Sequence, residues 1–155
     1  MHLTQHTDYA LRVLLLLAAD PDAPMDAPRI ADAYGISLHH VRKVVHELGR
    51  LEYISTTRGR TGGIRLRMAP DRIRLGQVAR DMEPNLTLVE CFDKTHNTCP
   101  IIGACGVERA LYAARDAFLA ELDRHTLADM IRRPKAMLAM LSSPRPGTEQ
   151  ARPPE

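Results

Sequence analysis

The chain has 155 residues, of which 45% are hydrophobic, and a formal net charge of +2. This length fits one compact domain with an appendage, and the hydrophobic content is high enough to exclude a globally disordered chain. There is no Trp, and there are only two Phe and four Tyr. A core must therefore consist mainly of aliphatic side chains, which favours helices over an all-β sandwich.

The longest apolar run near the N-terminus, residues 13–19, is too short to cross a bilayer. The charge before it is mixed, so we interpret it as part of a helix rather than as a signal peptide. We therefore expect a cytoplasmic protein with reduced thiols. The apolar spacing predicts a helix over residues 7–19, with Thr7 as its N-cap and an apolar face of Leu11, Leu14, Leu15 and Ala18.

Two further helices are predicted around a short turn. The first covers residues 28–34, begins at Pro28 and is ended by Gly35. The second begins after Ser37, its predicted N-cap, and has apolar residues at every third or fourth position: Leu38, Val41, Val44, Val45 and Leu48. Its outward side chains are predicted to be His39, His40, Arg42, Lys43 and His46. These are the proportions of a helix-turn-helix.

A basic β-hairpin is predicted directly after this pair of helices. Residues 53–57 and 64–68 have the composition of strands and flank the glycine-rich tip RGRTGG. Residues 37–67 carry seven Lys or Arg against Glu47 and Glu52, a net +5, whereas residues 1–36 carry two Arg against five Asp, a net −3. A helix-turn-helix followed by a basic hairpin indicates a winged helix, and the concentrated positive charge favours a polyanionic ligand.

In a winged helix the second helix of the pair enters the major groove of DNA, and the wing contacts the backbone or minor groove. We therefore predict that the DNA-contacting residues are Ser37, His39, His40, Arg42 and Lys43 on the helix, with Arg58 and Arg60 at the wing tip. For the charge run alone, the alternative is a solvated basic face.

A short helix is predicted over residues 75–83, and the longest helix over residues 107–123. The long helix carries an apolar stripe of Val107, Leu111, Ala114, Phe118 and Leu122, which suits a partner helix, so we expect a homodimer. The polar, Pro-rich C-terminal tail is expected to be disordered. The predicted fold is mainly α with a small β-wing, organised as a winged helix-turn-helix DNA-binding domain (1–83, wing about 53–68), a cysteine loop (84–106), a dimerisation helix region (107–131) and a C-terminal segment (132–155).

All three cysteines lie within fifteen residues, as Cys91, Cys99 and Cys105. Their spacing, Cys-x7-Cys-x5-Cys, lacks the close pairs typical of a tetrahedral zinc site. Wider gaps in a loop suit an iron–sulfur cluster, for which thiolates are the usual ligands. Three thiolates leave one iron in need of another ligand, and such a cluster is reactive at that iron.

Other interpretations of these cysteines remain open on spacing alone. They include buried apolar cysteines, a zinc site completed by His96 or Asp93, and a metal-free disulfide switch. A nucleophile pair of Cys91 or Cys99 with His96 is a further alternative, although no oxyanion device or orienting carboxylate is evident.

The chain resembles the Rrf-type winged-helix regulators over about residues 1–131. The opening MHLTQHTDYALRVLLLLA is similar to the first helix of that family, and RGRTGGIRL to its wing. The pieces ECFD, NTCPI and AFLAELDRHTLADM most resemble the NsrR branch. Members of the IscR branch have a histidine just after the third cysteine, where this chain has Gly106, Val107 and Glu108.

The resemblance implies an iron–sulfur cluster held by Cys91, Cys99 and Cys105, with [4Fe–4S] favoured over [2Fe–2S]. It also implies a fourth ligand from the first helix of the partner subunit, and the matching residue is Asp8. Without the resemblance, Asp8 would be read as an acid favoured by the helix dipole.

We expect a dimeric repressor, not an enzyme, that binds a palindromic site and releases it when nitric oxide attacks the cluster. The alternatives are a regulator of this type that senses iron, cluster supply or redox state, and a zinc-stabilised or cysteine-based enzyme or interaction protein.

Overall fold

The computed structural model describes residues 2–23, 25–57, 59 and 62–143. Its main elements, in chain order, are α1 (Gln5–Ala19), α2 (Ala27–Tyr34), α3 (Leu38–Arg50), β1 (Ile54–Thr57), β2 (Gly63–Leu66), α4 (Leu75–Met82), α5 (Gly106–Asp123), α6 (Leu127–Met130) and α7 (Pro134–Ser142). Short 3-10 turns cover Pro70–Arg72 and Glu90–Phe92. The fold is thus mainly α with one small antiparallel sheet, as the sequence predicts. No helix among the described residues is long and apolar enough to span a membrane.

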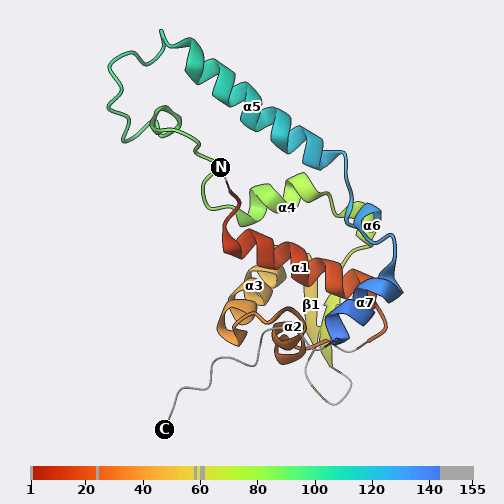
Figure 1. Cartoon of the computed structure of the whole chain (residues 1–155). Coiled ribbons are helices and arrows are strands. Elements are labelled where there is room, and N and C mark those ends of the chain that lie inside the picture. The colour runs from red at the N-terminus through yellow and green to blue at the C-terminus, as the bar shows by residue number, and fades with distance from the viewer. Residues whose placement is uncertain (1, 24, 58, 60–61, 144–155) are drawn as a thin grey trace.

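Helix α1 runs through the middle of the lower body in Figure 1, with α2, α3 and the hairpin on one side and α4 on the other. Its most deeply buried apolar residues are Ala10, Val13 and Leu14, at 0% exposure. The predicted apolar face is therefore partly wrong, because Leu11, Leu15 and Ala18 are only partly buried. Since neighbours contact α1 from several sides, its burial does not follow a single stripe.

The N-cap of α1 also differs from the prediction. Thr4 occupies that position, and its hydroxyl accepts a hydrogen bond from the Thr7 amide at 3.3 Å. Thr7 is instead fully buried inside the first turn. Both residues are threonines three positions apart, so either can satisfy a first-turn amide, and the fold selects the earlier one.

The turn between α2 and α3 has the predicted geometry. Asp26 caps α2 by accepting from the Arg29 amide at 2.8 Å, and Gly35 ends it in the left-handed region with φ 59°. Ser37 caps α3 by accepting from the His40 amide at 3.3 Å. Val41, Val44 and Leu48 are fully buried on one side of α3. This side packs against α1 and α2 and leaves the other side of α3 free for a ligand.

The hairpin pairs Ile54 with Leu66 and Thr57 with Gly63 in antiparallel register. Each strand is one residue shorter than predicted, and β2 begins one residue earlier and ends two residues earlier. Ile64 also donates its amide to the Met25 carbonyl at 2.7 Å, which ties the hairpin to the loop before α2. The Tyr53 hydroxyl donates to Asp81 on α4 at 2.6 Å, so the base of the wing is fixed to the body.

Helix α5 extends away from this body and contacts α4 at its C-terminal end (Figure 1). Its bounds agree with the predicted long helix to within one residue. At the contact with α4, the Arg80 guanidinium donates to both carboxylate oxygens of Asp123, at 2.6 and 2.7 Å. A Cβ atom on Gly76 would meet the Leu119 carbonyl oxygen at 2.7 Å, so only glycine permits this close approach.

The chain after α5 turns back to the body. The Leu127 amide donates to the Ile73 carbonyl at 2.8 Å, and α7 then packs against α1 and α2 through Leu138 and Leu141. The predicted C-terminal segment 132–155 therefore contains a helix that was not expected. The tail predicted to be disordered covers residues 142–155; its first residue, Ser142, instead ends α7 and Ser143 is the C-cap, while residues 144–155 lie outside the described residues.

Candidate metal centre and nucleic-acid interface

The three cysteines lie on the loop that connects α4 to the end of α5 that points away from the body (Figure 1). All three are free thiols of intermediate exposure. Partial burial raises the pKa of the Cys91 thiol, and the negative charges of Glu108, Cys99 and Cys105 add to that rise. A bound cation beside Cys91 would oppose this rise and favour its thiolate form.

The loop is folded by hydrogen bonds from its own acidic and amide side chains. Glu90 accepts from both the amide and the hydroxyl of Thr98, each at 2.6 Å. These two hydrogen bonds lower the pKa of the Glu90 carboxyl. The Asn97 side chain accepts from the Cys99 amide at 2.9 Å, and Glu108 accepts from the Gly103 amide at 3.3 Å. Polar contacts, rather than an apolar core, therefore shape this loop.

Aromatic stacking joins the start of the loop to α5. The rings of Phe92 and Tyr112 stack with centroids 3.8 Å apart and an interplanar angle of 3°. The Arg115 guanidinium carbon lies 4.9 Å from the Tyr112 ring centroid and 5.3 Å from that of Phe92. This contact fixes the residue after Cys91 to the helix that begins after Cys105. Sequence reasoning missed it, although Phe92 is one of only two phenylalanines in the chain.

Cys105 occupies the N-cap position of α5, where no side chain caps the helix. Helix N-termini favour negative charge, as an anionic thiolate ligand would have. Within the described residues, however, no three His, Cys, Asp or Glu side chains are arranged to hold one metal ion. His96 and Asp93, the residues considered for zinc, hydrogen-bond each other at 2.9 Å. The chemistry of the three thiols fits an iron–sulfur cluster, since thiolates are its usual ligands.

Asp8 lies in the first turn of α1 and pairs with Arg12 of the same helix at 2.6 Å. Figure 1 places α1 in the body, well separated from the part of the loop that carries the cysteines. Asp8 and the cysteines of one chain are therefore not brought together. Its neighbour Tyr9 lies against His40 of α3, with ring centroids 6.1 Å apart. The start of α1 is also held by Glu83, which accepts from the Thr4 amide at 2.6 Å.

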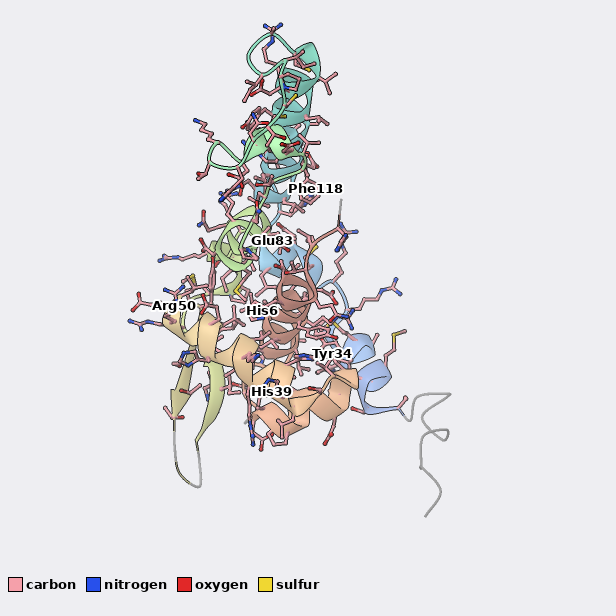
Figure 2. All side chains as sticks on the ribbon, turned by 90° about the vertical axis from the view of Figure 1, so that its left-hand side faces the viewer. His6, Tyr34, His39, Arg50, Glu83 and Phe118 are labelled. Atoms are coloured by element: carbon pink, nitrogen blue, oxygen red, sulfur yellow. The ribbon has the colours of Figure 1, made fainter. Side chains whose placement is uncertain are left out.

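The outward side of α3 carries the predicted DNA-contacting residues. Ser37, His39, His40, Arg42 and Lys43 are all exposed. Figure 2 shows His39 and Arg50 near opposite ends of α3, with His6 on the neighbouring helix. A shallow hollow along this side is lined by His6, His39, Arg42, Lys43, His46 and Glu47. The wing residues Arg58 and Arg60 lie outside the described residues.

The basic side chains of this region divide into paired and unpaired groups. Arg50 pairs with Glu47 at 2.6 Å and Arg67 with Glu52 at 3.1 Å, while Arg65 donates to the Pro21 carbonyl at 2.7 Å. In the part of the chain that the structure describes, Arg42 and Lys43 form no ion pair. Among the described basic side chains of residues 37–67, Arg42 and Lys43 of α3 are therefore the ones without an ion pair or a carbonyl contact that could bind a phosphate backbone.

Helices α2 and α3 with the β1–β2 hairpin define a winged helix-turn-helix protein, a class that binds DNA. The chain belongs to the Rrf2 family, whose family model, described as an iron-dependent transcriptional regulator, matches residues 3–133. It is therefore a transcriptional regulator of that family.

Relatives of known name agree with this assignment. The helix-turn-helix transcriptional regulator NsrR of Bacillus subtilis is 44% identical over 142 residues, covering 91% of this chain and 97% of the relative. The protein of the same name from Geobacillus kaustophilus is 47% identical over 146 residues, covering 94% and 99%. These relatives are named as regulators, which confirms the expectation that the chain is not an enzyme.

Solved structures share the fold. The cysteine regulator CymR of B. subtilis aligns with a TM-score of 0.68 and 25% identity, covering 84% of this chain and 95% of that one. The IscR protein of T. potens aligns with a TM-score of 0.67 over 85% of this chain and 87% of that one, at 21% identity.

Proposed function

We propose that this protein is a cytoplasmic, dimeric repressor that binds a palindromic operator and responds to nitric oxide through an iron–sulfur cluster. The observation that carries the proposal is the gathering of Cys91, Cys99 and Cys105 on one loop of a chain that is 44–47% identical to two regulators named NsrR. These three thiolates would hold a [4Fe–4S] cluster. When bound, it would supply iron atoms that react with nitric oxide.

Asp8 of the partner subunit is the proposed fourth ligand. Within one chain Asp8 pairs with Arg12 at 2.6 Å, so binding iron would require it to leave or share that guanidinium. A carboxylate oxygen is a hard ligand in a thiolate site and would be the weakest of the four. We expect it to be the first ligand to be lost.

The route from Asp8 to DNA passes through α1. Asp8 is next to Tyr9, whose ring lies 6.1 Å from that of His40, and α1 packs along α3. Release of Asp8 would free the first turn of α1 and change the angle between the two recognition helices of a dimer. Because half-site spacing must match that angle, a modest rotation would remove most of the specific affinity.

The exposed surface of α5 and the cysteine loop supports the proposed dimer. Ile101, Ile102 and Val107 are exposed at 57%, 48% and 63%, which is unusual for large apolar side chains grouped at one end of a monomer. An apolar hollow near the other end of the loop is lined in part by Leu86, Leu88, Leu111 and Phe118. A second copy packing along α5 would cover both and would shield the cluster from water.

DNA binding is assigned to Ser37, His39, His40, Arg42 and Lys43, with Arg58 and Arg60 of the wing added from the sequence. Arg42 and Lys43 are exposed and form no ion pair among the described residues, so they are available to phosphates. Phosphate contacts would supply much of the affinity, which should fall steeply with salt.

The test is a nitric oxide titration of anaerobically purified protein, monitored by visible absorption and by binding to operator DNA. Both signals should be lost together, with a decrease in DNA affinity of about a hundredfold, equivalent to about 3 kcal/mol. Asp8→Ala should alter the spectrum or the rate of reaction, and Asp32→Ala, an exposed acid on α2, should change neither. Full DNA binding after complete bleaching would refute the proposal.

A second signal is favoured by one observation, since the matching family model is described as iron-dependent. In that case the same loop would report iron or cluster supply. DNA binding would then follow iron loading and would be restored by adding iron and sulfide. Nitric oxide at amounts equal to the cluster would leave operator binding unchanged.

A further inference from the structure

The carboxylate of Glu90 links the two ends of the segment between Cys91 and Cys99. Glu90 precedes the first cysteine and Thr98 precedes the second, and Glu90 Oε1 accepts from the Thr98 amide and hydroxyl, both at 2.6 Å. One carboxylate oxygen therefore links Glu90 to Thr98, eight residues later. Glu90 is bonded to Cys91, and Thr98 is bonded to Cys99.

The residues between the cysteines are folded so that this contact can form. Asp93 Oδ1 accepts from the Thr95 amide at 2.9 Å and from the His96 amide at 3.2 Å, and the side chain of Asn97 accepts from the Cys99 amide. In a fully extended chain, the eight steps from Cys91 to Cys99 would separate the two cysteines by about 27 Å. The turn at Asp93 shortens that path, and Glu90 fixes its two ends together.

The second gap, from Cys99 to Cys105, is closed differently. Glu108 in the first turn of α5 accepts from the Gly103 amide, and Gly103 has a positive φ of 79°. In each of the two segments, one glutamate side chain thus accepts a hydrogen bond from a backbone amide of the loop. Since no core residue from the loop is available to do this, Glu90 has no packing role that would explain its contact with Thr98.

We infer that Glu90 is a positioning residue that holds the Cys91 thiol beside the Cys99 thiol before any cluster is bound. The inference deepens the proposed function, because it assigns the group that preorganises two of its three ligands. Preorganisation removes part of the loop entropy that ligand binding would otherwise oppose. If Glu90 has this role, the effective concentration of the Cys91 thiol at the Cys99 thiol should be high in the metal-free protein.

That quantity can be measured without iron. In metal-free full-length protein with Cys105→Ser, oxidised glutathione exchanges with the two remaining thiols. Both lose their protons to two molecules of reduced glutathione as the Cys91–Cys99 disulfide forms. The equilibrium ratio of disulfide to dithiol, at a fixed glutathione poise, gives the effective concentration. Mass spectrometry of the trapped protein provides the ratio.

Glu90→Ala should lower the effective concentration by about three- to tenfold, a modest change because the contact is exposed. Glu90→Gln, which keeps an acceptor oxygen, should lie between Glu90→Ala and the parent. Glu121→Ala, at an exposed glutamate of α5 paired with Arg124, should match the parent. The urea midpoint should stay the same in all three, which separates positioning from general destabilisation.

An unchanged ratio in Glu90→Ala would overturn the inference, as would a parent protein that forms no Cys91–Cys99 disulfide. Iron content of the same variants, purified anaerobically with Cys105 restored, separates this inference from the proposed function. If Glu90→Ala lowers the ratio of disulfide to dithiol but the parent protein never holds iron, the result would support the positioning role and refute the proposed sensor.

Discussion

The DNA-binding core, formed by α1–α4, the β1–β2 hairpin, α6 and α7, contains nearly all of the buried aliphatic side chains. In the cysteine arm, residues 84–123, only Leu119 is a buried hydrophobic residue among those the structure describes. The arm is instead held by polar contacts, one aromatic stack and the ion pair of Arg80 with Asp123. The core is stabilised by its own packing, whereas the arm leaves Ile101, Ile102 and Val107 exposed.

The largest expected contrast comes from matched leucines in the two regions. Leu14→Ala removes a fully buried side chain from the core and should lower the free energy of unfolding by about 2–5 kcal/mol. Leu111→Ala, on the partly exposed side of α5, should lower it by under about 1 kcal/mol in metal-free monomer. Urea unfolding at a fixed low protein concentration measures both. Equal losses would show that the arm has a core of its own.

Gly76 tests how the two regions are joined. In Gly76→Ala the new methyl group would meet Asp123 and the Leu119 carbonyl, so the α4–α5 contact must open, at a cost of about 1–3 kcal/mol. Gly49→Ala is the control, because a Cβ atom there has no neighbour within 4 Å. Alanine in that helix should be stabilising by about 0.5–1 kcal/mol. Thermal unfolding of both variants distinguishes a steric clash at the α4–α5 contact from the general effect of replacing glycine by alanine in a helix.

Tyr53 tests the attachment of the wing to the core. Tyr53→Phe removes the hydrogen bond to Asp81 and should lower the free energy of unfolding by about 1–2 kcal/mol.

Burial and the Asp81 contact raise the pKa of the Tyr53 phenol above its ordinary value. The stabilisation should therefore be complete below about pH 10 and should decline as pH rises above it. Unfolding measurements from pH 7 to 11 would show the two proteins converging. A constant difference across this range would contradict the assigned contact.

The smallest expected effect is on the salt dependence of DNA binding, and it compares cations of α3 that form no ion pair with one that does. Arg42→Gln and Lys43→Gln should each reduce the slope of log affinity against log salt by about 0.9 if each contacts one phosphate. Arg50→Gln should change the slope less, since Arg50 is paired with Glu47 at 2.6 Å. Fluorescence anisotropy with operator DNA at several salt concentrations provides the slopes. A larger effect at Arg50 would place DNA on the other end of α3.

Most of the core could be predicted because its signals are local. Ser37 and Gly35 mark the ends of helices through capping chemistry, and the three- and four-residue spacing of Val41, Val44 and Leu48 gives the buried side of α3. The burial of α1 was less predictable, since five or more elements contact it and no single periodicity describes that environment. Helix α7 was missed because its short apolar run lies directly before a polar, proline-rich tail.

The cysteine site could be predicted only in its composition. Spacing indicates a loop that binds something larger than one ion, but the contacts that fold it, such as Glu90 with Thr98, join residues eight apart and follow no helical or strand period. The stack of Phe92 on Tyr112 joins residues twenty apart. The role of Asp8 remains a proposal, because a ligand from another chain leaves no spacing signal in the sequence.

The most direct test of the account is the iron and acid-labile sulfide content of protein purified without oxygen. A [4Fe–4S] cluster held by Cys91, Cys99 and Cys105 predicts about four iron and four sulfide per subunit. Cys99→Ser should lose most of both while keeping its helical content. Stoichiometric zinc without iron, in a protein that still binds its operator, would contradict the central claim.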